Sequence, residues 1–429
     1  MKSLEELAAE LQGYDPHALP ASAVHAFLQR WVEPIRDVER VALPAARERI
    51  LAQAVVAPMD VPPHDNAAMD GYAVRGADLH PSQPTTLQVL GTCYAGQAGW
   101  VQPVPAGACV RIMTGAVMPA GCDTVVPLEL VSATSDTTIT LPPGVVRPGE
   151  HRRLRGEDLA AGQPALQAGQ RLGPAALGLA ASLGQAELTV VRRARVAYFS
   201  TGDEVLSLGQ PWRPGAIYDS NRYTLTALLH RLGVEVIDLG VVRDEPAELE
   251  AALRAAAAQA DAVITSGGVS MGEADHTKAM MRRLGDVVFW RIAMRPGRPM
   301  AVGSLRLAPD TAPTLLFGLP GNPVAAMVTF LVFVRPALLR LMGASPSELL
   351  PLRARSNEPM RKKPGRTEYQ RGIVSRAPDG SLQVRTTGQQ GSGVLRSMVE
   401  ANGLIVLHHD QGSVAVGDEV DVLMFEGLI

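Results

Sequence analysis

Apolar residues recur with different periods along the 429-residue chain, and the changes of period divide it into segments. From Pro20 to Val56, and again from Ala160 to Leu188, apolar positions lie at helical spacing, which predicts two helical segments. From about Asp60 to Pro148, short Val- and Thr-rich runs such as TTLQVLGT and DTTITLPPG are separated by Gly and Pro. These runs predict an all-β module, inserted between two parts of one helical region that pack against each other.

After Ala194 the pattern changes to an alternation of strands and helices. Buried-strand runs (ARVAYFST, VEVIDLGVV, ADAVITS, TLLFGL) alternate with helical runs, the last of which is VAAMVTFLVFVRPALLRLMG. This alternation predicts βαβ units and a parallel sheet that is covered on both faces. After Gly343, short runs such as EYQRGIVSR and DEVDVLMF predict a small β-barrel or sandwich.

The predicted fold class is therefore multidomain α/β plus β: a parallel-sheet α/β domain, a helical region with an inserted β module, and a C-terminal β-barrel. The predicted boundaries are 1–56 and 159–193 for the helical region, 57–158 for the β module, 194–343 for the α/β domain and 344–429 for the barrel.

Composition and charge exclude several classes of protein. The 40 basic and 43 acidic residues leave a net charge of −3, without the basic surplus of a general nucleic-acid binder. Three cysteines, Cys93, Cys109 and Cys122, cannot all pair and match no metal-site spacing, so we expect reduced thiols in a cytoplasmic protein. The longest apolar stretch, 323–334, is shorter than the roughly 20 residues of a membrane span. MKSLEELAAEL predicts a helix start rather than a signal peptide. We expect a soluble protein with neither nucleic-acid nor membrane partners.

Acidic residues follow three of the predicted parallel strands, at the edge of an open sheet where ligands bind. They are Glu204 in STGDE, Asp244 in RDE and Asp275 in GEAD. Neighbouring carboxylates raise one another's pKa unless a cation offsets their charge, so the sequence predicts a site for oxygen-ligated Mg²⁺. The alternative is that each acid caps the helix that follows it.

Two further features suit an anionic substrate. The Gly267–Gly268 turn, flanked by Ser266 and Ser270, lets backbone N–H groups approach a ligand closely. In RIAMRPGRP, the prolines and glycine fix the backbone of Arg295 and Arg298, and Arg291 begins the run. Fixed arginines suit an oxyanion site.

Within the predicted β module, the loop VPPHDNAAMDGYAV at 61–74 carries two acids, Asp65 and Asp70. Asn, Asp, Gly and Pro also make ordinary solvated turns, so the loop alone allows either interpretation. The basic run HRRLRGED at 151–158 could likewise form a solvated loop.

These blocks together resemble the molybdopterin molybdenumtransferases, whose eukaryotic relatives include the gephyrin E domain. PPHDNAAMDGYAVR resembles the family's DNSAMDGYA signature. RIMTGAVMPAGCDTVVP, GEHRRLRGED, STGDE, IYDSNR, ITSGGVSMGEADHTK, RPGRP, GLPGNPVAAM, KKPGR and GQQGSG…ANGLIVL follow in the family's order. The resemblance covers nearly the whole chain beyond its first twenty residues. It implies a molybdopterin-binding-like α/β domain, and an elongated homodimer whose active site lies between the α/β domain of one subunit and the β module of the other.

The resemblance also implies a reaction. The family binds molybdopterin adenylate, made by a partner adenylyltransferase, together with molybdate; it cleaves the adenylate, inserts the metal into the dithiolene and releases AMP. Magnesium, or zinc in some members, is the activating ion. The residues implied for catalysis are Asp65, Glu204, Asp244 and Asp275, the last three also as metal ligands. With the loops named above, the expected substrate-binding residues are Thr114, Asp158, Ser266, Gly267, Gly268, Ser270, Arg291, Arg295, Arg298, Pro320, Pro323, Arg371 and Ser392.

The chain departs from the family pattern at a few positions. The usual KPGKP has both lysines replaced by Arg295 and Arg298, which keep the charge but present a planar fork. His64 replaces the usual Phe, and Ala67 the usual Ser. Two rival hypotheses are a non-catalytic molybdopterin-binding or scaffold protein, as gephyrin also is, and a nucleotide pyrophosphatase related to competence proteins. The latter lack the DNxAMDGYA module.

Overall fold

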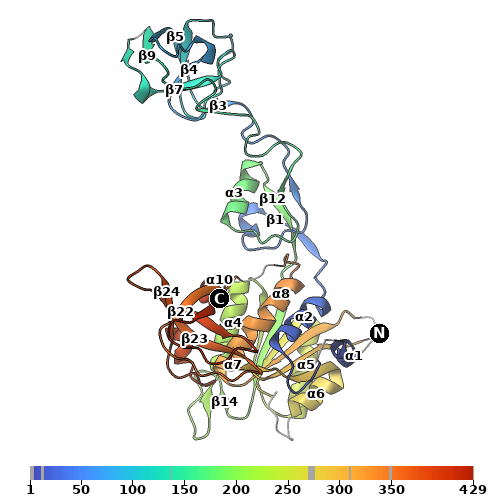
Figure 1. Ribbon diagram of the computed structural model, residues 1–429. Helices are drawn as coiled ribbons and strands as arrows, with labels where there is room; N and C mark the ends of the chain where they lie inside the picture. Colours follow the sequence, from blue (N-terminus) through green and yellow to red (C-terminus); the bar gives the residue numbers. More distant parts are fainter. Residues whose placement is uncertain are drawn as a thin grey trace. The chain divides into compact units, whose positions relative to one another are not determined.

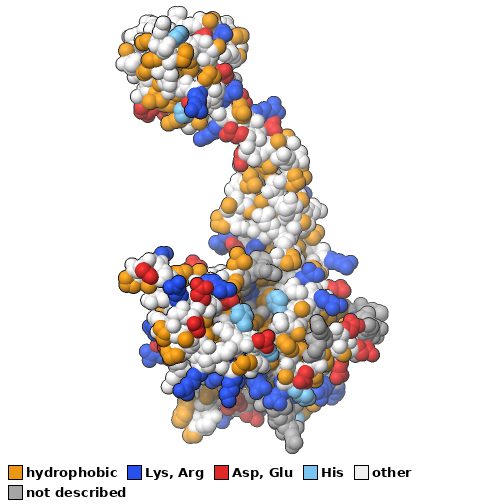
Figure 2. Space-filling model, viewed as in Figure 1, with side chains coloured by type: hydrophobic (Ala, Val, Ile, Leu, Met, Phe, Trp, Pro, Cys, Tyr) orange, Lys and Arg blue, Asp and Glu red, His pale blue; other side chains and the backbone are white. Residues whose placement is uncertain are grey.

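The computed structural model describes residues 4–10, 14–135, 137–268, 276–308, 311–346 and 350–428. The chain forms two compact units (Figure 1). Unit 1 comprises 1–39, 48–50 and 190–429, and unit 2 comprises 40–47 and 51–189. Unit 2 is thus inserted into the sequence of unit 1. Basic and acidic side chains are intermingled over the visible face of both units (Figure 2).

Unit 1 is built on a six-stranded sheet, in the order β16, β13, β17, β21, β20, β18. The bounds are β16 Glu235–Val242, β13 Arg195–Thr201, β17 Ala262–Ser266, β21 Thr314–Leu319, β20 Pro299–Leu305 and β18 Gly285–Arg291. The first four strands are parallel, which confirms the predicted α/β domain. At one edge, β20 pairs antiparallel with β21, and β18 pairs antiparallel with β20. The sheet is therefore mixed rather than wholly parallel.

Helices cover both faces of this sheet because successive side chains of a buried strand point to opposite faces. Tyr198 and Ile264 belong to the core on one face, and Phe199 and Val263 to the core on the other. The main helices of the first core are α2 Ala21–Trp31, α4 Ser220–Leu232, α7 Pro323–Thr329, the π-helix η4 Phe330–Val334 and α8 Arg335–Leu341. The short helix α1 Leu4–Ala9 contacts β18 and adds Leu4 and Ala8 to this core. The second core lies under α5 Pro246–Gln259 and α6 His276–Leu284.

The continuous helix from Pro323 to Leu341 is apolar enough, and at 19 residues long enough, to cross a membrane by those criteria alone. It is longer than the apolar stretch counted from the sequence. Two thirds of its most apolar window is buried inside the protein. It packs against α2 and α4, so it serves as the central helix of the first core.

The C-terminal part of unit 1 is a closed five-stranded barrel, as the sequence predicts. Its strands follow the order β23, β24, β22, β26, β25, and β25 pairs with β23 to close it, while β19 adds to the outside of β23. The bounds are β19 Met294–Arg295, β22 Leu352–Ser356, β23 Thr367–Arg376, β24 Leu382–Thr386, β25 Gly403–Leu407, β26 Glu419–Met424, α9 Arg396–Glu400 and α10 Phe425–Leu428. A small parallel pair, β14 Val205–Leu206 with β15 Ile217–Tyr218, follows β13.

Unit 2 contains the predicted β module, a six-stranded sheet in the order β7, β4, β6, β5, β9, β8. The bounds are β4 Gly71–Val74, β5 Thr85–Cys93, β6 Ala108–Ile112, β7 Thr124–Pro127, β8 Ala133–Thr134 and β9 Thr138–Leu141. Cys93, Cys109 and Cys122 are free and buried in its cores. Burial raises the pKa of both Cys109 and Cys122 to about 12, so neither forms a reactive thiolate at neutral pH.

The helical segments on either side of the β module are shorter than their periodicity predicts. Between 43 and 56 the chain forms the 3₁₀ helix η1 Leu43–Ala46 and the strand β2 Val55–Val56, and between 160 and 188 only α3 Pro174–Ser182 is helical. Short strand pairs occupy the rest: β2 with β11 Pro164–Leu166, β3 Asn66–Ala67 with β10 Arg152–Arg153, and β1 Val38–Ala42 with β12 Glu187–Val191. The remaining 3₁₀ helices are η2 Gly76–Asp78 and η3 Leu128–Leu130. Moreover, α2 packs within unit 1, whereas α3 belongs to unit 2.

Candidate functional site

The parallel strands of unit 1 form a topological switch point between β13 and β17. The next strand of this sheet after β13 is β16, on one side, and the next after β17 is β18, at the edge of the other side. Because the connections diverge there, the carboxyl ends of these two strands are the place where ligands of open α/β sheets bind, and this edge is called the crevice below. The strands end at Thr201 and Ser266.

Two glycines bring backbone to this crevice. Gly267 has a φ of +91°, and a Cβ there would lie 2.2 Å from the carbonyl oxygen of Thr201. Gly268 has a φ of +64°, and its Cβ would lie 2.4 Å from Oγ1 of Thr277. Only glycine fits such close approaches at these φ values. The predicted Gly267–Gly268 turn therefore lies at the crevice. Because glycine has no side chain, a ligand there could approach the backbone of this turn.

The side chain of Ser266 serves the core beneath the crevice. Its Oγ lies 2.7 Å from the hydroxyl of Tyr198 and 3.2 Å from Oγ of Ser200, and Ser200 lies 2.8 Å from Tyr198. Ser266 is 2% exposed, and burial raises the pKa of Tyr198 above its ordinary value. Any contact of Ser266 with a ligand would therefore involve its backbone.

The acids predicted as metal ligands follow adjacent strands. Glu204, after β13, is exposed, and its carboxylate lies so close to Gly202 that a Cβ there would be 2.7 Å from Oε2. Asp244, after β16, is half-buried, and its Oδ1 accepts a hydrogen bond of 3.3 Å from Oγ1 of Thr277 at the start of α6. Asp275 and Ser270 lie outside the described residues. Among the residues that the structure describes, no group of three or more His, Cys, Asp or Glu could hold a metal ion.

Replacing Asp244 by Asn should weaken metal-dependent turnover without unfolding the protein. An amide oxygen can still accept the Thr277 hydrogen bond, and polar changes outside a core usually cost little stability. Loss of the carboxylate should weaken Mg²⁺ activation about ten- to a hundred-fold, the range seen when groups around a metal are removed. The measurements are activity as Mg²⁺ is titrated and the melting temperature.

The neighbouring exposed acid Glu245 provides a matched control, because Glu245→Gln removes the same charge at the cap of α5. That variant should keep its Mg²⁺ requirement. A large fall in melting temperature for Asp244→Asn would show instead that Asp244 is a structural cap.

The RPGRP loop runs from β19 to β20 and carries two of the predicted arginines. Arg295 and Arg298 are exposed, and within the described part of the chain neither guanidinium has a hydrogen bond or an ion pair. Arg291, at the end of β18, is half-buried, and its backbone bonds to Pro16 and Leu19. The loop therefore presents two cations that are free to bind an anion.

Arg371, on β23, is a buried cation. It is 1% exposed; its Nε donates to Oγ of Ser397 over 3.0 Å, and its Nη2 donates to the carbonyl oxygen of Gly391 over 3.1 Å. No Asp or Glu of the described residues pairs with this guanidinium. Burial, with a smaller contribution from the nearby charge of Arg295, lowers the pKa of Arg371 to about 10.

The loops that carry Ser392 and Pro320 are tied to this region by backbone contacts. The carbonyl oxygen of Ser392 accepts a 3.0 Å hydrogen bond from the N–H of Val324, next to Pro323 in the first turn of α7. Gly321, just before α7, lies close to Gly267, because a Cβ on Gly321 would be 3.8 Å from Cα of Gly267. The structure therefore joins the PGNP turn both to the Gly267 turn and to the Ser392 loop.

Some contacts around the site involve residues that were not predicted. Nδ2 of Asn221, at the start of α4, donates to the carbonyl oxygen of Gly321 over 2.8 Å. Oε1 of Gln390 accepts the N–H of Arg371 over 2.8 Å, and its Nε2 donates back to the Arg371 carbonyl over 3.1 Å. The signals for these two residues were the blocks IYDSNR and GQQGSG, whose resemblance to the family does not single out Asn221 or Gln390.

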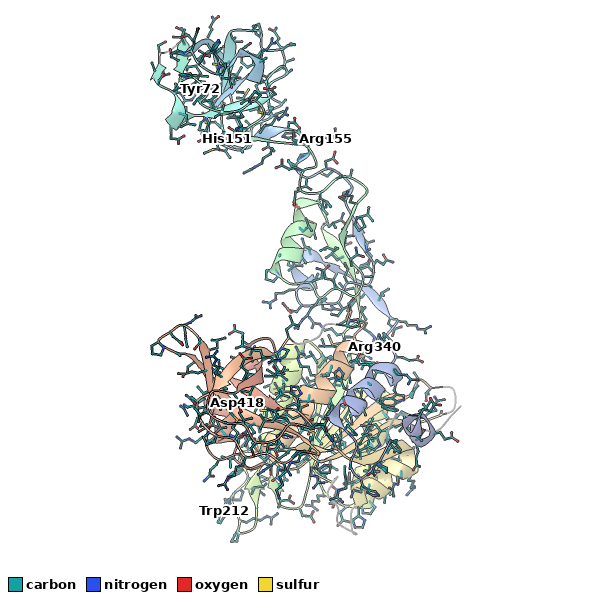
Figure 3. The ribbon with its side chains drawn as sticks, in the orientation of Figure 1. Tyr72, His151, Arg155, Trp212, Arg340 and Asp418 are labelled. Atoms are coloured by element: carbon teal, nitrogen blue, oxygen red, sulfur yellow. The ribbon has the colours of Figure 1, made fainter. Side chains whose placement is uncertain are left out.

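Unit 2 carries the three remaining predicted residues. Oδ1 of Asp65 accepts the N–H of Arg155 over 2.8 Å, and Oδ2 lies 3.5 Å from Nη1 of Arg152. Arg155 is labelled in Figure 3. The Asp65 side chain is 37% exposed, so it remains accessible. Asp158 is also exposed, and its N–H bonds to the carbonyl oxygen of Val61.

Thr114 contacts Asp70 rather than Asp65. Both its N–H and its Oγ1 donate to Oδ1 of Asp70 over 2.7 Å. These two hydrogen bonds lower the pKa of Asp70. The second acid of the DNAAMDGYA loop thus fixes Thr114.

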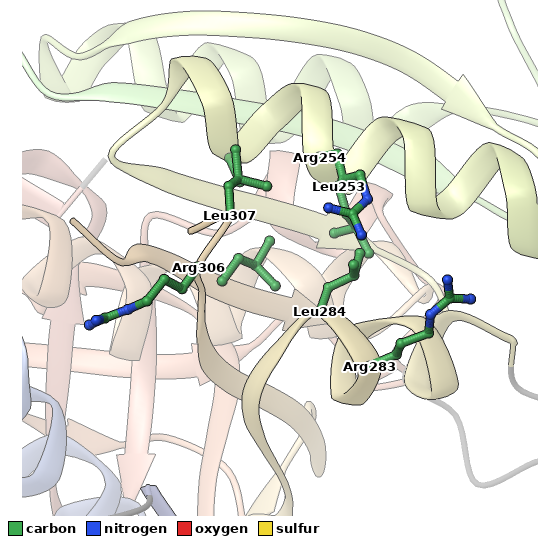
Figure 4. Close-up of a pocket in the computed structure, with 8 residues that line it drawn as sticks. Leu253, Arg254, Arg283, Leu284, Arg306 and Leu307 are labelled. Atoms are coloured by element: carbon green, nitrogen blue, oxygen red, sulfur yellow. The ribbon is translucent and has the colours of Figure 1, made fainter. Parts of the chain in front are cut away.

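Figure 4 shows a pocket of about 140 Å³. It lies at the amino ends of the parallel strands, opposite the crevice, because its lining residue Leu305 pairs with Thr314 at the start of β21. Leu253, Leu284 and Leu305 line it, with Arg254 and Arg283 at its rim. Both arginines pair with Glu250, so their charge is partly neutralised. The pocket is separate from the predicted chemistry.

Comparisons with known proteins match most of the chain. The MoeA N-terminal region (domain I and II) matches residues 19–184, a probable molybdopterin binding domain matches 197–340, and the MoeA C-terminal region (domain IV) matches 353–425. The chain is 43% identical to the molybdopterin molybdenumtransferase of Haemophilus influenzae, over 92% of this chain and 95% of the relative. It is 39% identical to that of Nostoc sp., over 90% and 89%. The crystal structure of the molybdopterin biosynthesis moeA protein from Pyrococcus horikoshii OT3 aligns with a TM-score of 0.79 and 26% identity, over 95% of this chain and 100% of that one.

Proposed function

The chain belongs to the molybdopterin molybdenumtransferase (MoeA) family, and from this premise we propose that it inserts molybdate into molybdopterin, using the adenylated pterin and releasing AMP. Its role as a transferase of molybdenum cofactor biosynthesis follows from the relatives. The use of molybdopterin adenylate, and the order in which its bonds break, belong to the proposal.

The observation that carries the proposal is the buried, unpaired charge of Arg371. A buried cation without a carboxylate is costly unless an anion or several acceptors compensate it. The guanidinium of Arg371 has only a hydroxyl and a carbonyl as hydrogen-bond partners, and the nearby charge of Arg295 contributes to lowering its pKa. A tetrahedral dianion such as molybdate would neutralise both cations and accept charge-assisted hydrogen bonds from them. Arg298 and the Ser392 loop would complete this oxyanion site.

The adenylate would bind in the crevice between β13 and β17. The backbone of Gly267 and Gly268 can approach phosphate oxygens, as glycine turns do in phosphate-binding loops. Glu204 and Asp244 provide oxygen donors at the same edge, and Asp275 would add a third. Oxygen donors fit Mg²⁺ rather than a softer metal. Bound there, Mg²⁺ would offset the negative charge that develops as the phosphoanhydride is cleaved.

We further propose that the protein works as a homodimer in the cytoplasm and receives its adenylated substrate from a molybdopterin adenylyltransferase. Asp65 is exposed and belongs to unit 2, whereas the crevice residues belong to unit 1. In a dimer, Asp65 of one subunit would serve the crevice of the other, with Thr114 held beside it by Asp70.

Release of AMP tests the proposal. Purified protein with Mg²⁺ and molybdopterin adenylate should release AMP when molybdate is added, and much more slowly without it. A non-catalytic scaffold would bind the pterin and release no AMP. A nucleotide pyrophosphatase would release AMP at the same rate with and without molybdate.

The pKa of Arg371 predicts how molybdate binding depends on pH. Its pKa of about 10 is lower than the ordinary 12.5, so the free protein loses this charge as the pH rises through 10. A bound dianion favours the charged form, hence molybdate affinity should fall by about ten-fold for each pH unit above 10. Binding at that pH should also take up protons, which titration calorimetry in two buffers measures. Arg371→Met should bind more weakly and lose this pH step; an unchanged step would place the titrating group elsewhere.

A further inference from the structure

The RPGRP loop approaches the helix Pro323–Leu341 most closely at a single glycine. Gly297 has a φ of +93°, and a Cβ there would lie 2.4 Å from Oγ1 of Thr329 and 3.3 Å from the carbonyl oxygen of Ala325. Real Cβ atoms do not approach other atoms as closely as 2.4 Å. The loop therefore touches the helix where only glycine fits both the space and the backbone conformation.

Thr329 is an unusual residue for this contact with Gly297. It is completely buried, it is the last residue of α7 before the π-helical turn η4, and its Oγ1 has no hydrogen-bond partner among the described residues. A helical threonine often bonds to the carbonyl four residues earlier, here that of Ala325. An unpaired buried hydroxyl costs stability, so hydrogen bonding does not explain why threonine occupies this position. The packing of its side chain against Gly297 explains it.

The same helix contacts both loops of the proposed oxyanion site. Its first turn bonds to the Ser392 loop through Val324, and Thr329 supports the loop of Arg295 and Arg298 less than two helical turns later. π-helical turns occur frequently at functional sites. We infer that Thr329 is a positioning residue, which sets the placement of Arg295 and Arg298 relative to the Ser392 loop. This inference rests on the oxyanion site proposed above.

Substitutions of Gly297 and Thr329 test the inference. Thr329→Ala removes the support, and Gly297→Ala adds an atom that collides with it. Each should raise the dissociation constant for molybdate about ten-fold, because small misplacements of binding groups carry costs of this order or more. Half-saturation by the adenylated pterin should change little. Thr329→Val, which keeps the shape without the hydroxyl, should bind molybdate like the unchanged protein.

The Gly297→Ala/Thr329→Ala double variant is the sharpest measurement, because shortening Thr329 makes room for the new Cβ. Its dissociation constant for molybdate should be lower than that of Gly297→Ala alone. Thr314→Ala is the matched control: Thr314 is buried at the opposite end of β21, and its loss should lower the melting temperature without changing molybdate binding. The probes are sodium molybdate in equilibrium dialysis, AMP release and thermal melting.

Two results separate the inference from the proposed function. If the unchanged protein binds molybdate but the Thr329 and Gly297 variants bind it equally well, the inference is wrong and the proposed function stands. The same conclusion follows if Thr314→Ala weakens molybdate binding as much as Thr329→Ala does. If the unchanged protein neither binds molybdate nor responds to it in AMP release, both fail.

Discussion

Replacing Arg295 or Arg298 by alanine should raise the half-saturating molybdate concentration about ten- to a hundred-fold, because a charge-assisted contact is worth roughly 1.5–3 kcal/mol. Both side chains are exposed and have no partner within the described residues, so removing them leaves no buried group unsatisfied. The folded protein should therefore keep its stability. The measurement is AMP release from molybdopterin adenylate as molybdate is titrated.

Lysine variants and a distant arginine provide the controls. Lysine at either position should retain most activity, with altered discrimination between molybdate and tungstate, because a point charge replaces a planar fork. Arg254→Ala removes an arginine of the pocket in Figure 4 and should leave the molybdate requirement unchanged. An unchanged half-saturating concentration in both alanine variants of the loop would place the oxyanion site elsewhere.

Mixing two inactive variants should restore activity if subunits share their sites. Asp65→Asn disables the contribution of unit 2, and Glu204→Ala disables the crevice of unit 1. Each hybrid dimer would combine an intact Asp65 with an intact Glu204 in one of its two sites. With random pairing, about a quarter of the unmutated activity should return, since a two-fold symmetric dimer has two equivalent sites.

The pairing of defects distinguishes a shared site from a site contained within one subunit. At a Mg²⁺ concentration too low to activate Asp244→Asn, that variant should also complement Asp65→Asn, because Asp244 belongs to the crevice. At the same Mg²⁺ concentration, Glu204→Ala mixed with Asp244→Asn should remain inactive, because both defects affect the same crevice. Hybrids that form, as judged by differently tagged subunits, yet stay inactive would refute the shared site.

The buried parallel strands of unit 1 could be predicted because each is a short apolar run that ends in turn residues. β18 and β20 were not predicted, although Gly285–Arg291 and Pro299–Leu305 each form seven residues of strand. They flank the RPGRP loop, whose arginines suggested chemistry rather than structure. Their role as an antiparallel edge depends on pairing with β21, and neither pattern nor propensity contains that information.

Helix formation between 45 and 55 was predicted from the helical spacing of apolar residues, and tertiary structure overrides it. Ile50 packs in the core of unit 1 with α2, whereas Leu51 belongs to unit 2. Neighbouring residues that serve different cores cannot lie on one helical face. Propensity is a weak prior under such constraints.

Residue types in the candidate site were easier to predict than their contacts. The rigid arginines and the acids at strand ends followed from local sequence. The burial of Arg371 and the pairing of Thr114 with Asp70 did not, because each depends on residues distant in the chain. The sequence also suggested Ser266 as a ligand residue, whereas its hydroxyl is committed to Tyr198 and Ser200.

The insertion of unit 2 into unit 1 determines the order in which the protein can fold on the ribosome. Unit 2 is complete once residue 189 has been made, and domains generally fold as units during synthesis. α2 is made earlier, yet its buried residues Val24, Phe27 and Leu28 share a core with the helix Pro323–Leu341. Its apolar face must therefore stay exposed, or be shielded by chaperones, until that helix emerges. Chains that end between residue 189 and the helix Pro323–Leu341 should accordingly aggregate even though they contain the whole of unit 2.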